Sequence, residues 1–375
     1  MRNAVIITAA ILGLTACGQG EGKAASGDAG GVAQAAAAAA IAPETRSFGD
    51  WTAICDNGLR CVAYGKGDGA VGWVRVEYPA GPQATPLVHV AAMNDLGGQQ
   101  RPVTAALDGR AWPSTVEEDG YSARISDGLA AARALAQGRS LALSIDGEEP
   151  TTVSLNGAAA ALLWIDEKQG RLNTTTALVR IGERPASAVR AAPSLPLVAA
   201  APAVDQGPFS QPADPEAEPR YFPLPAGLSA LPAVAQCRRN LEFNPSLLDY
   251  VQAARLAGDK ELWLVPCDAG AYNLITLQFL TDAGGANPVQ LRLKGTEGGG
   301  DDEQASDLEL TNADYDAATR TLSQFAKARG IGDCGVEHRW TWTGRDFVLA
   351  GERVMGDCIG MVSDLWPTTW RTRAQ

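Results

Sequence analysis

Two regions of this chain of 375 residues are dominated by short runs in which apolar and polar positions alternate. Such alternation puts every second side chain on one face, so it predicts β-strands with one buried side. Two helices are also expected in the first region, at Gly128–Gln137, which Ser126 or Asp127 can cap and Gly138 ends, and at Ala158–Glu167. The strands expected there are Trp51–Cys55, Arg60–Tyr64, Gly72–Glu77, Leu87–Ala91, Ser140–Ile145 and Thr151–Leu155.

The second region repeats the alternation over a longer series of strands. It begins with a short helix expected at Leu231–Arg239. The turns between successive strands are short, which is typical of an antiparallel meander. The predicted fold class is therefore mainly β (α+β): two antiparallel β-rich, sandwich-like domains with few short helices. The strands expected in the second region are Tyr250–Leu256, Glu261–Pro266, Asn273–Leu280, Val289–Lys294, Asp307–Leu310, Thr321–Lys327, Gly335–Thr343 and Phe347–Glu352.

Residues 185–226, between the two regions, are rich in Pro and Ala and have no periodic apolar pattern. Pro-rich segments favour an extended, semi-rigid conformation. This composition predicts a linker between a first domain at 46–184 and a second domain at 227–375. The alternative is a loop packed on one of the domains.

The beginning of the chain has the pattern of an export signal. Arg2 precedes a short apolar run, Ala4–Leu14, and a membrane span would need about 20 apolar residues. Residues 1–16 are therefore predicted to be a signal peptide. Leu14-Thr15-Ala16-Cys17 resembles the lipobox of bacterial lipoproteins, which implies that Cys17 becomes the acylated N-terminus, with palmitate among its acyl groups. The alternative is an ordinary signal peptide followed by a spare thiol.

Acylation of Cys17 would anchor the protein to a membrane, because two or more acyl chains bind a bilayer stably. Residues 17–45, rich in Gly and Ala, would then be a flexible tether. The next residue is Gly18 rather than Asp. By resemblance to bacterial lipoproteins, this favours the outer membrane, with the folded part facing the periplasm.

Charge and composition narrow the classes of partner. The formal net charge is −12, which argues against nucleic acid because that partner requires a basic surface. The two histidines, His89 and His338, are too few for a His-based metal site. No metal or other cofactor is therefore expected.

Six cysteines remain once Cys17 is set aside, and an even number in an exported protein predicts disulfides. Six cysteines allow 15 connectivities. We favour the pairing of sequential neighbours because it keeps each bridge within one domain. A metal site or a catalytic thiol is the alternative, although no Cys-x-x-Cys occurs. The favoured pairs are Cys55–Cys61, Cys237–Cys267 and Cys334–Cys358.

Several stretches resemble known families. Four stretches of the second region share their pattern with one family: Leu262–Asn273, Asn312–Phe325, Gly330–Gly335 and Trp340-x-Trp342. On these stretches, the second region is similar to the uncharacterised bacterial family catalogued as domain of unknown function 1176. This resemblance implies an exported protein of unknown activity and carries over no catalytic residues. The opening of the first region, Phe48-Gly49-Asp50-Trp51 followed by Cys55 and Cys61, is loosely similar to the invasion-associated locus B family.

The loop Gly330-Ile331-Gly332-Asp333-Cys334-Gly335 is the best candidate for a binding site. Glycines let a backbone turn its N–H groups toward a ligand, and Arg329 and His338 are close in sequence. An anion or carboxylate could bind there. The alternative, which we favour, is a disulfide-bearing turn between two strands.

Two further candidates concern catalysis and cation binding. His338 could be a general base oriented by Asp333, with Ser323 as nucleophile, but no Gly-x-Ser-x-Gly motif is present. A structural histidine is the favoured interpretation. Residues 298–307 are acidic but lack the spacing of a Ca²⁺ loop, so they are expected to be a solvated loop.

Trp340 and Trp342 should lie on one face of their strand. They could stack on a sugar or a peptide, or they could belong to the core. With the loop residues Arg329, Gly330, Gly332 and Asp333 and with His338, they complete the predicted binding residues.

The favoured function is that of a lipid-anchored, non-enzymatic binding or interaction protein of the cell envelope, with an envelope protein or a glycan as partner. The first alternative is a periplasmic inhibitor of a cell-wall lytic enzyme, similar to lysozyme inhibitors. An envelope hydrolase is the second alternative.

Overall fold

The computed structural model describes residues 41–68, 72–92, 103–119, 122–145, 149–214, 217–296 and 307–374. The predicted signal peptide, Cys17 and most of the predicted tether lie outside these ranges, as does most of the acidic loop at 298–307. No helix among the described residues is both long and apolar enough to cross a bilayer.

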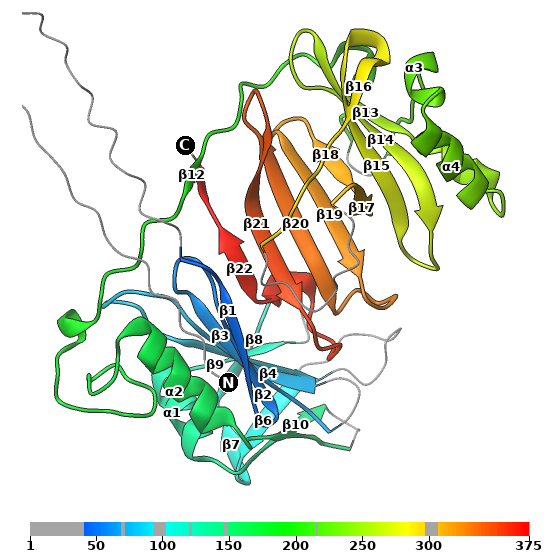
Figure 1. Cartoon of the computed structure of the whole chain (residues 1–375). Helices are drawn as coiled ribbons and strands as arrows, with labels where there is room; N and C mark the ends of the chain where they lie inside the picture. Colours follow the sequence, from blue (N-terminus) through cyan, green and yellow to red (C-terminus); the bar gives the residue numbers. More distant parts are fainter. Residues whose placement is uncertain are drawn as a thin grey trace, which may run out of the picture. The chain divides into compact units, whose positions relative to one another are not determined.

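The first region contains a seven-stranded antiparallel sheet in the order β1-β2-β3-β4-β5-β9-β8. A smaller sheet, β11-β10-β6-β7, packs with it, and helices α1 (Gly128–Gln137) and α2 (Ala158–Gln169) cover the larger sheet (Figure 1). The strand bounds are β1 Glu44–Phe48, β2 Trp51–Cys55, β3 Cys61–Lys66, β4 Gly72–Tyr78, β5 Leu87–Ala92, β6 Val103–Leu107, β7 Arg110–Trp112, β8 Ser114–Val116, β9 Ala123–Ile125, β10 Ser140–Ile145 and β11 Thr151–Ser154.

Both faces of the larger sheet are buried. One face, with Trp51 and Val76, joins the core formed by the two helices and the smaller sheet. The opposite face, with Ile54 and Trp73, packs against Trp366 and the Cys334–Cys358 bridge from the end of the chain. This double burial explains why β3 and β4 are almost entirely buried rather than alternating.

The second region is built from two further antiparallel sheets. One has the order β13-β14-β15-β16, with β17 also paired to β15, and the other has the order β18-β19-β20-β21-β22. Their facing sides share a core that contains Leu262, Leu264 and Leu322. The bounds are β13 Gln252–Arg255, β14 Lys260–Ala269, β15 Leu274–Asp282, β16 Ala286–Gln290, β17 Glu309–Thr311, β18 Asp314–Asp316, β19 Thr321–Lys327, β20 Gly335–Trp342, β21 Phe347–Met355 and β22 Thr368–Arg371.

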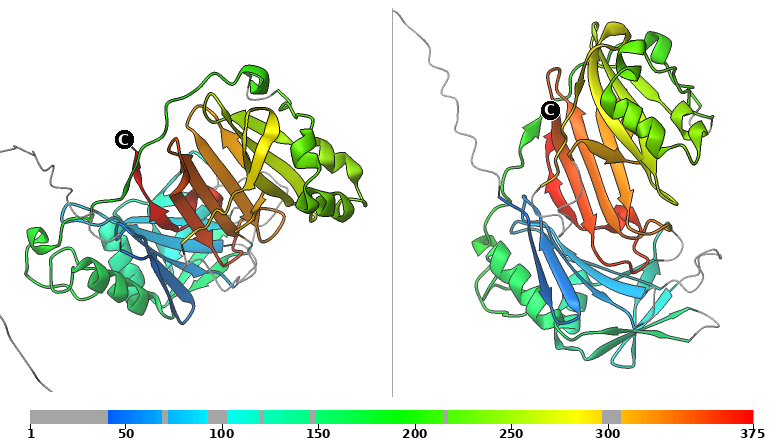
Figure 2. Two further views of the ribbon diagram at one scale, coloured as in Figure 1. Left: turned by 45° about the horizontal axis from the view of Figure 1, so that its top comes forward. Right: turned by 45° about the vertical axis from the view of Figure 1, so that its right-hand side comes forward.

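Helices α3 (Ala226–Ser229) and α4 (Pro232–Asn240) lie on the outer face of the first of these sheets (Figure 2). Val234 and Cys237 of α4 are buried there against Trp263 and Val265 of β14. The predicted fold class, β-rich and sandwich-like with few helices, is therefore confirmed.

The three predicted disulfides are present, at Cys55–Cys61, Cys237–Cys267 and Cys334–Cys358. The first closes the β2–β3 turn, because its two cysteines face each other in the strand register. The second ties α4 to β14, and the third joins the loop before β20 to the loop after β21.

Residues 185–226, the predicted linker, follow a defined path in their described part. Leu197–Val198 form strand β12, which pairs in parallel with β23 (Arg373–Ala374). The N–H of Ala201 donates to the carbonyl of Trp342, and Phe209 is buried beside Trp263. The contacts of residues 40–375 define one compact unit.

Candidate functional site

A pocket of about 510 Å³ lies where two edge strands of the second region approach each other. Edge strand β13 supplies Gln252, Ala253 and Ala254, and edge strand β18 supplies residues 314–316. Leu262 and Leu264 of β14 add apolar surface. Small-molecule sites in proteins are commonly clefts of about 300–1,000 Å³ with apolar walls and a few polar groups, so the pocket has the size and character of such a site.

The third wall comes from residues 206–214 and 217–220, which we call the strap. The side-chain amide of Gln206 bonds both backbone groups of Arg255, accepting from its N–H at 2.9 Å and donating to its carbonyl at 3.1 Å. The N–H of Phe222 donates to the carbonyl of Val251 at 2.9 Å. Gln206 thus fixes the beginning of the strap to β13, and the bond of Phe222 holds the residues that follow the strap to Val251, just before β13.

A side-chain clamp holds the two arms of the strap together. Gln211 accepts from the N–H of Arg220 at 2.7 Å and donates to its carbonyl at 3.1 Å. The Arg220 guanidinium also donates to the carbonyl of Ser210 at 2.8 Å. Because these contacts replace backbone pairing, a segment rich in proline, which lacks the N–H donor, can still form a defined wall.

The charged groups of β18 make this side of the pocket acidic. Burial and the neighbouring Asp316 raise the pKa of Asp314, whereas a hydrogen bond from Thr319 holds the pKa of Asp316 below its usual value. No ion pair involves Asp314 within the described part of the chain. Asp314 is therefore available to a cationic ligand.

Tyr315 also lines the pocket. Burial raises the pKa of Tyr315 to about 12, so the phenol stays protonated at neutral pH. Its hydroxyl is buried and has no hydrogen-bond partner in the described ranges. An unpaired buried hydroxyl is costly, and a bound ligand that reaches it could lower that cost.

The predicted loop at 329–335 is a closed structural turn. The Arg329 guanidinium bonds Asp333 through two contacts of 2.6 and 2.5 Å, and Asp333 also accepts from the N–H of Gly360 at 2.6 Å. These bonds keep the pKa of Asp333 below its usual value despite burial. Because Arg329 is bonded within the loop, the predicted role as an anion site is not supported by this geometry.

The glycines of this loop have steric reasons to be there. Gly332 has a φ of +69°, and a Cβ at Gly335 would stand 2.0 Å from the carbonyl oxygen of Ala326. Asp333 lies close to Cys334 and Cys358, but both sulfur atoms are used in a disulfide. This group is therefore a bridged turn, as the favoured interpretation of the sequence predicted.

His338 does not have the predicted partner. Its Nε2 lies 2.8 Å from Oε2 of Glu352, and its Nδ1 lies 2.7 Å from the side-chain nitrogen of Gln324. Asp333 bonds elsewhere, so His338 lacks the orienting partner that the catalytic alternative required. With Gln324 donating to Nδ1 and Nε2–H donating to Glu352, neither ring nitrogen is free to act as a general base.

Glu352 is buried and anchors three segments at once. Besides His338, it accepts from the N–H and hydroxyl of Thr296 and from the hydroxyl of Thr369. These hydrogen bonds lower the pKa of Glu352 although burial opposes ionisation. The group is a structural centre that ties β20, β21 and β22 to residue 296.

Trp340 and Trp342 share one face of β20, as predicted, but that face is buried. Each is 2% exposed and packs in the core between the two sheets of the second region. In this structure they therefore belong to the core, which is the alternative that the sequence left open. The alternation of residues along β20 predicted that the two tryptophans share a face, but it does not indicate whether a second sheet covers that face.

Comparison with known proteins places this chain in a family. A family model described as "Protein of unknown function (DUF1176)" matches residues 45–373. The chain belongs to the DUF1176 family. The match includes both β-rich regions and the segment between them, so the resemblance predicted mainly for the second region extends through the first.

A relative and a solved structure add to this comparison. The "Uncharacterized protein YpfG" of Escherichia coli (strain K12) is 31% identical over 370 residues, which cover 88% of this chain and 94% of that protein. The crystal structure of invasion associated protein B from Bartonella henselae is 20% identical and covers 34% of this chain and 99% of its own, with a TM-score of 0.26.

The pocket residues of this DUF1176 protein were not singled out as a site by sequence reasoning. Tyr315 and Asp316 did appear in the stretch that resembles the family, and the strap lies in the segment expected to be a linker. The missing information was the pairing of distant segments. Gln206 and Arg255 are 49 residues apart, and no periodic pattern connects them.

Proposed function

We propose that this protein is a non-enzymatic binding protein of the cell envelope, held by acyl groups on Cys17 at the outer membrane and facing the periplasm. The pocket between β13, β18 and the strap is its ligand site. The observation that carries this proposal is the combination of an apolar floor, an unpaired buried hydroxyl at Tyr315 and an ionisable rim in one cavity of suitable volume. The three disulfides suit an oxidising compartment.

Blocking the pocket tests the binding function. Ala217 lines the pocket and is exposed, so Ala217→Trp should fill part of it without disturbing the core. Ala213 is exposed on the same strap and does not line the pocket, which makes Ala213→Trp the matched control. Soluble Cys17→Ser protein is incubated with the low-molecular-mass fraction of envelopes, and retained compounds are measured by native mass spectrometry.

We expect the Cys17→Ser protein and its Ala213→Trp form to retain the same compound and the Ala217→Trp form to lose it. Retention by Ala217→Trp, or no retained compound in any form, would contradict the assignment of the pocket. A parallel cross-linking experiment on envelopes with the Cys17-bearing protein tests for an envelope protein or glycan partner.

Anchoring is tested separately. Cells are grown with a palmitate analogue that can be labelled, and the protein is isolated. We expect the label on the wild-type protein and none on Cys17→Ser, which should appear in the soluble periplasmic fraction. Equal fractionation of the two forms would refute the anchor.

A second candidate function, inhibition of a cell-wall lytic enzyme, is favoured by one observation. The loop at 329–335 is fixed by a disulfide and by the Arg329–Asp333 pair, yet its tip residue Ile331 is 43% exposed. A rigid loop with an apolar tip suits insertion into an enzyme cleft. If the protein slows glycan hydrolysis, Ile331→Glu should abolish the effect, whereas the control Val289→Glu, at a residue that is 61% exposed and outside this loop, should not.

A further inference from the structure

The backbone of edge strand β13 is only partly hydrogen-bonded on its outer side. The bonds of Val251 and Arg255 show which backbone groups between them have no partner. In an antiparallel pair, alternate residues direct their N–H and C=O toward the partner strand or away from it. Arg255 bonds Gln206 on the outer side, and Val251 accepts from Phe222 on that side. Ala253 lies midway between them, so its N–H and C=O also point outward.

The described part of the chain offers these two groups of Ala253 no hydrogen-bond partner. The register places Ala253 opposite Trp263, between the pairs of Gln252 with Leu264 and of Ala254 with Leu262. Those flanking pairs make the ladder bonds to β14. Because Ala253 lines the pocket, its free donor and acceptor face the cavity.

The dimensions of this gap limit what can fill it. Four residue steps separate Val251 from Arg255, which corresponds to about 14 Å of strand. Gln206 of the strap occupies the outer edge at Arg255, and Phe222, which follows the strap, occupies it at Val251. An occupant that pairs with Ala253 therefore has room for about three residues of extended chain, and added strands of this kind are a recurrent mode of peptide recognition.

Charge selects among such peptides. On β18, Asp314 has no ion-pair partner in the described residues, and Asp316 is held ionised by the bonds from Thr319 and Ala318. The strap supplies one cation, Arg220, whose guanidinium is bonded to Ser210. The side of the pocket formed by β18 therefore complements an ammonium group.

We propose that the pocket binds a short peptide of about three residues that carries a free amino group, with its backbone paired to Ala253 and its ammonium group at Asp314. This ligand class rests on the proposed function, since it assigns the occupant of the same pocket. The apolar floor at Leu262 and Leu264 takes small aliphatic side chains of the peptide.

The test uses the tripeptide Ala-Ala-Lys amide and measures its affinity for the Cys17→Ser protein by isothermal titration calorimetry. Acetyl-Ala-Ala-Glu, of similar size and opposite charge, is the control ligand. We expect the first peptide to bind and the second to bind at least tenfold more weakly, because a hydrogen-bonded charge typically contributes a factor of ten or more.

Three variants and one control variant locate the contact. Asp314→Asn should weaken the lysine peptide about tenfold. Ala253→Pro removes the outward N–H and leaves the ladder bonds to β14 in place, since proline is tolerated on the free side of an edge strand; it should weaken binding several-fold. Ala217→Trp should abolish binding, and Ala213→Trp should leave it unchanged. If Ala253→Pro fails to fold, a depsipeptide with an ester in place of the central amide removes the matching donor from the ligand.

The outcomes separate this inference from the proposed function. Equal binding of the acidic and basic peptides, or unchanged affinity in Asp314→Asn, would overturn the assignment of the ligand class. A different outcome is that the peptide does not bind, while the Cys17→Ser protein retains an envelope compound and the Ala217→Trp form does not. In that case the pocket remains a binding site and the peptide class is wrong. If neither is retained, both proposals fail.

Discussion

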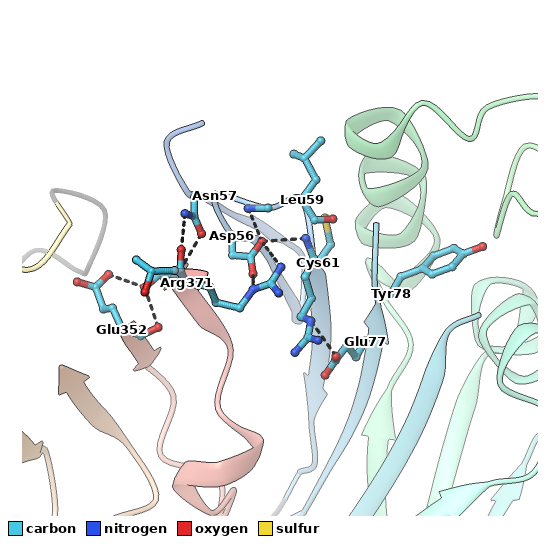
Figure 3. Close-up of polar contacts among 12 residues, drawn as sticks. Asp56, Asn57, Leu59, Cys61, Glu77, Tyr78, Glu352 and Arg371 are labelled. Atoms are coloured by element: carbon cyan, nitrogen blue, oxygen red, sulfur yellow. Dashed lines mark hydrogen bonds and ion pairs between the residues drawn. The ribbon is translucent and has the colours of Figure 1, made fainter. Parts of the chain in front are cut away.

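At the residue scale, Asp56 is a buried charged group with one partner far away in sequence. Asp56 is fully buried in the turn between β2 and β3, where it accepts from the N–H groups of Gly58 and Arg60, both at 2.8 Å, and pairs with the Arg371 guanidinium (Figure 3). Asn57 bonds the backbone of Arg371 through both ends of its side chain. The sequence shows a turn at this position but not that Arg371 closes it.

Replacing Asp56 with Ala should lower the free energy of unfolding by about 3 kcal/mol, because the change leaves a partly buried guanidinium and two N–H groups without a partner. The control is Asp346→Ala, which removes an exposed ion pair with Arg345 and should change stability by less than about 0.5 kcal/mol. Chemical denaturation measures both. Similar values for the two variants would contradict a structural role for Asp56.

His89 gives a prediction for the dependence of stability on pH. Burial and the nearby Arg75 lower its pKa from the usual 6.5, while Glu117 and Glu77 act in the opposite direction and Arg124 adds to the lowering. Below pH 6.5 the unfolded chain therefore takes up a proton before the folded one does, so stability should fall as the pH decreases from 6.5. In His89→Gln this part of the decrease should be absent in denaturation curves measured between pH 7 and 5, whereas an identical slope would exclude His89 as its source.

At the scale of elements, local signals predicted helices and paired strands well. Helix α1 has the predicted bounds, because Asp127 caps its first turn by accepting from Ala130 and Gly138 ends it. Strand β16 was predicted too late, at Val289–Lys294. It spans Ala286–Gln290, although Leu291 and Leu293 continue with bonds to Gln278 and Asp307. Strand β1 was missed because its side chains do not alternate between buried and exposed.

The disulfides should differ in how strongly they stabilise the elements they join. Cys237–Cys267 closes a separation of 30 residues and Cys55–Cys61 one of 6. Loop-closure entropy then predicts that the free energy of unfolding falls by about 3.6 kcal/mol when Cys237 and Cys267 are both replaced with Ala. The same change at Cys55 and Cys61 should lower it by about 2.2 kcal/mol. Denaturant titration of the two double variants measures the difference. The reverse order would show that native-state contacts outweigh the effect on the unfolded chain.

At the scale of the whole molecule, composition predicted two β-rich regions joined by a linker, but it could not show how these parts contact one another. Residues 185–226 have the composition of a free linker, yet backbone bonds at Ala201 and Phe222 fix this segment to strands. In addition, Ile54 and Trp73 of the first sheet share a core with Trp366. Contacts of this kind depend on how the surfaces of two folded regions fit together. The pattern of apolar and polar residues within one region does not predict that fit.

Because this core is shared, residues 40–375 should unfold in one cooperative transition. Calorimetry of the Cys17→Ser protein should show a single peak whose calorimetric and van't Hoff enthalpies agree. Trp366→Ala, which opens the shared core, should move the midpoint of both β-rich regions together. Two separated peaks in the wild-type protein would instead indicate independent domains.

The pairing of Asp56 with Arg371 also has a consequence for biosynthesis. The two residues are 315 positions apart, so during synthesis the β2–β3 turn emerges long before the cation that neutralises it. The turn can form early because its disulfide and its N–H bonds are local. Its carboxylate acquires its last partner only when nearly the entire sequence has been delivered. A chain cut short before residue 371 would leave that site incomplete, and its lower stability would make the unfinished product a better substrate for proteases.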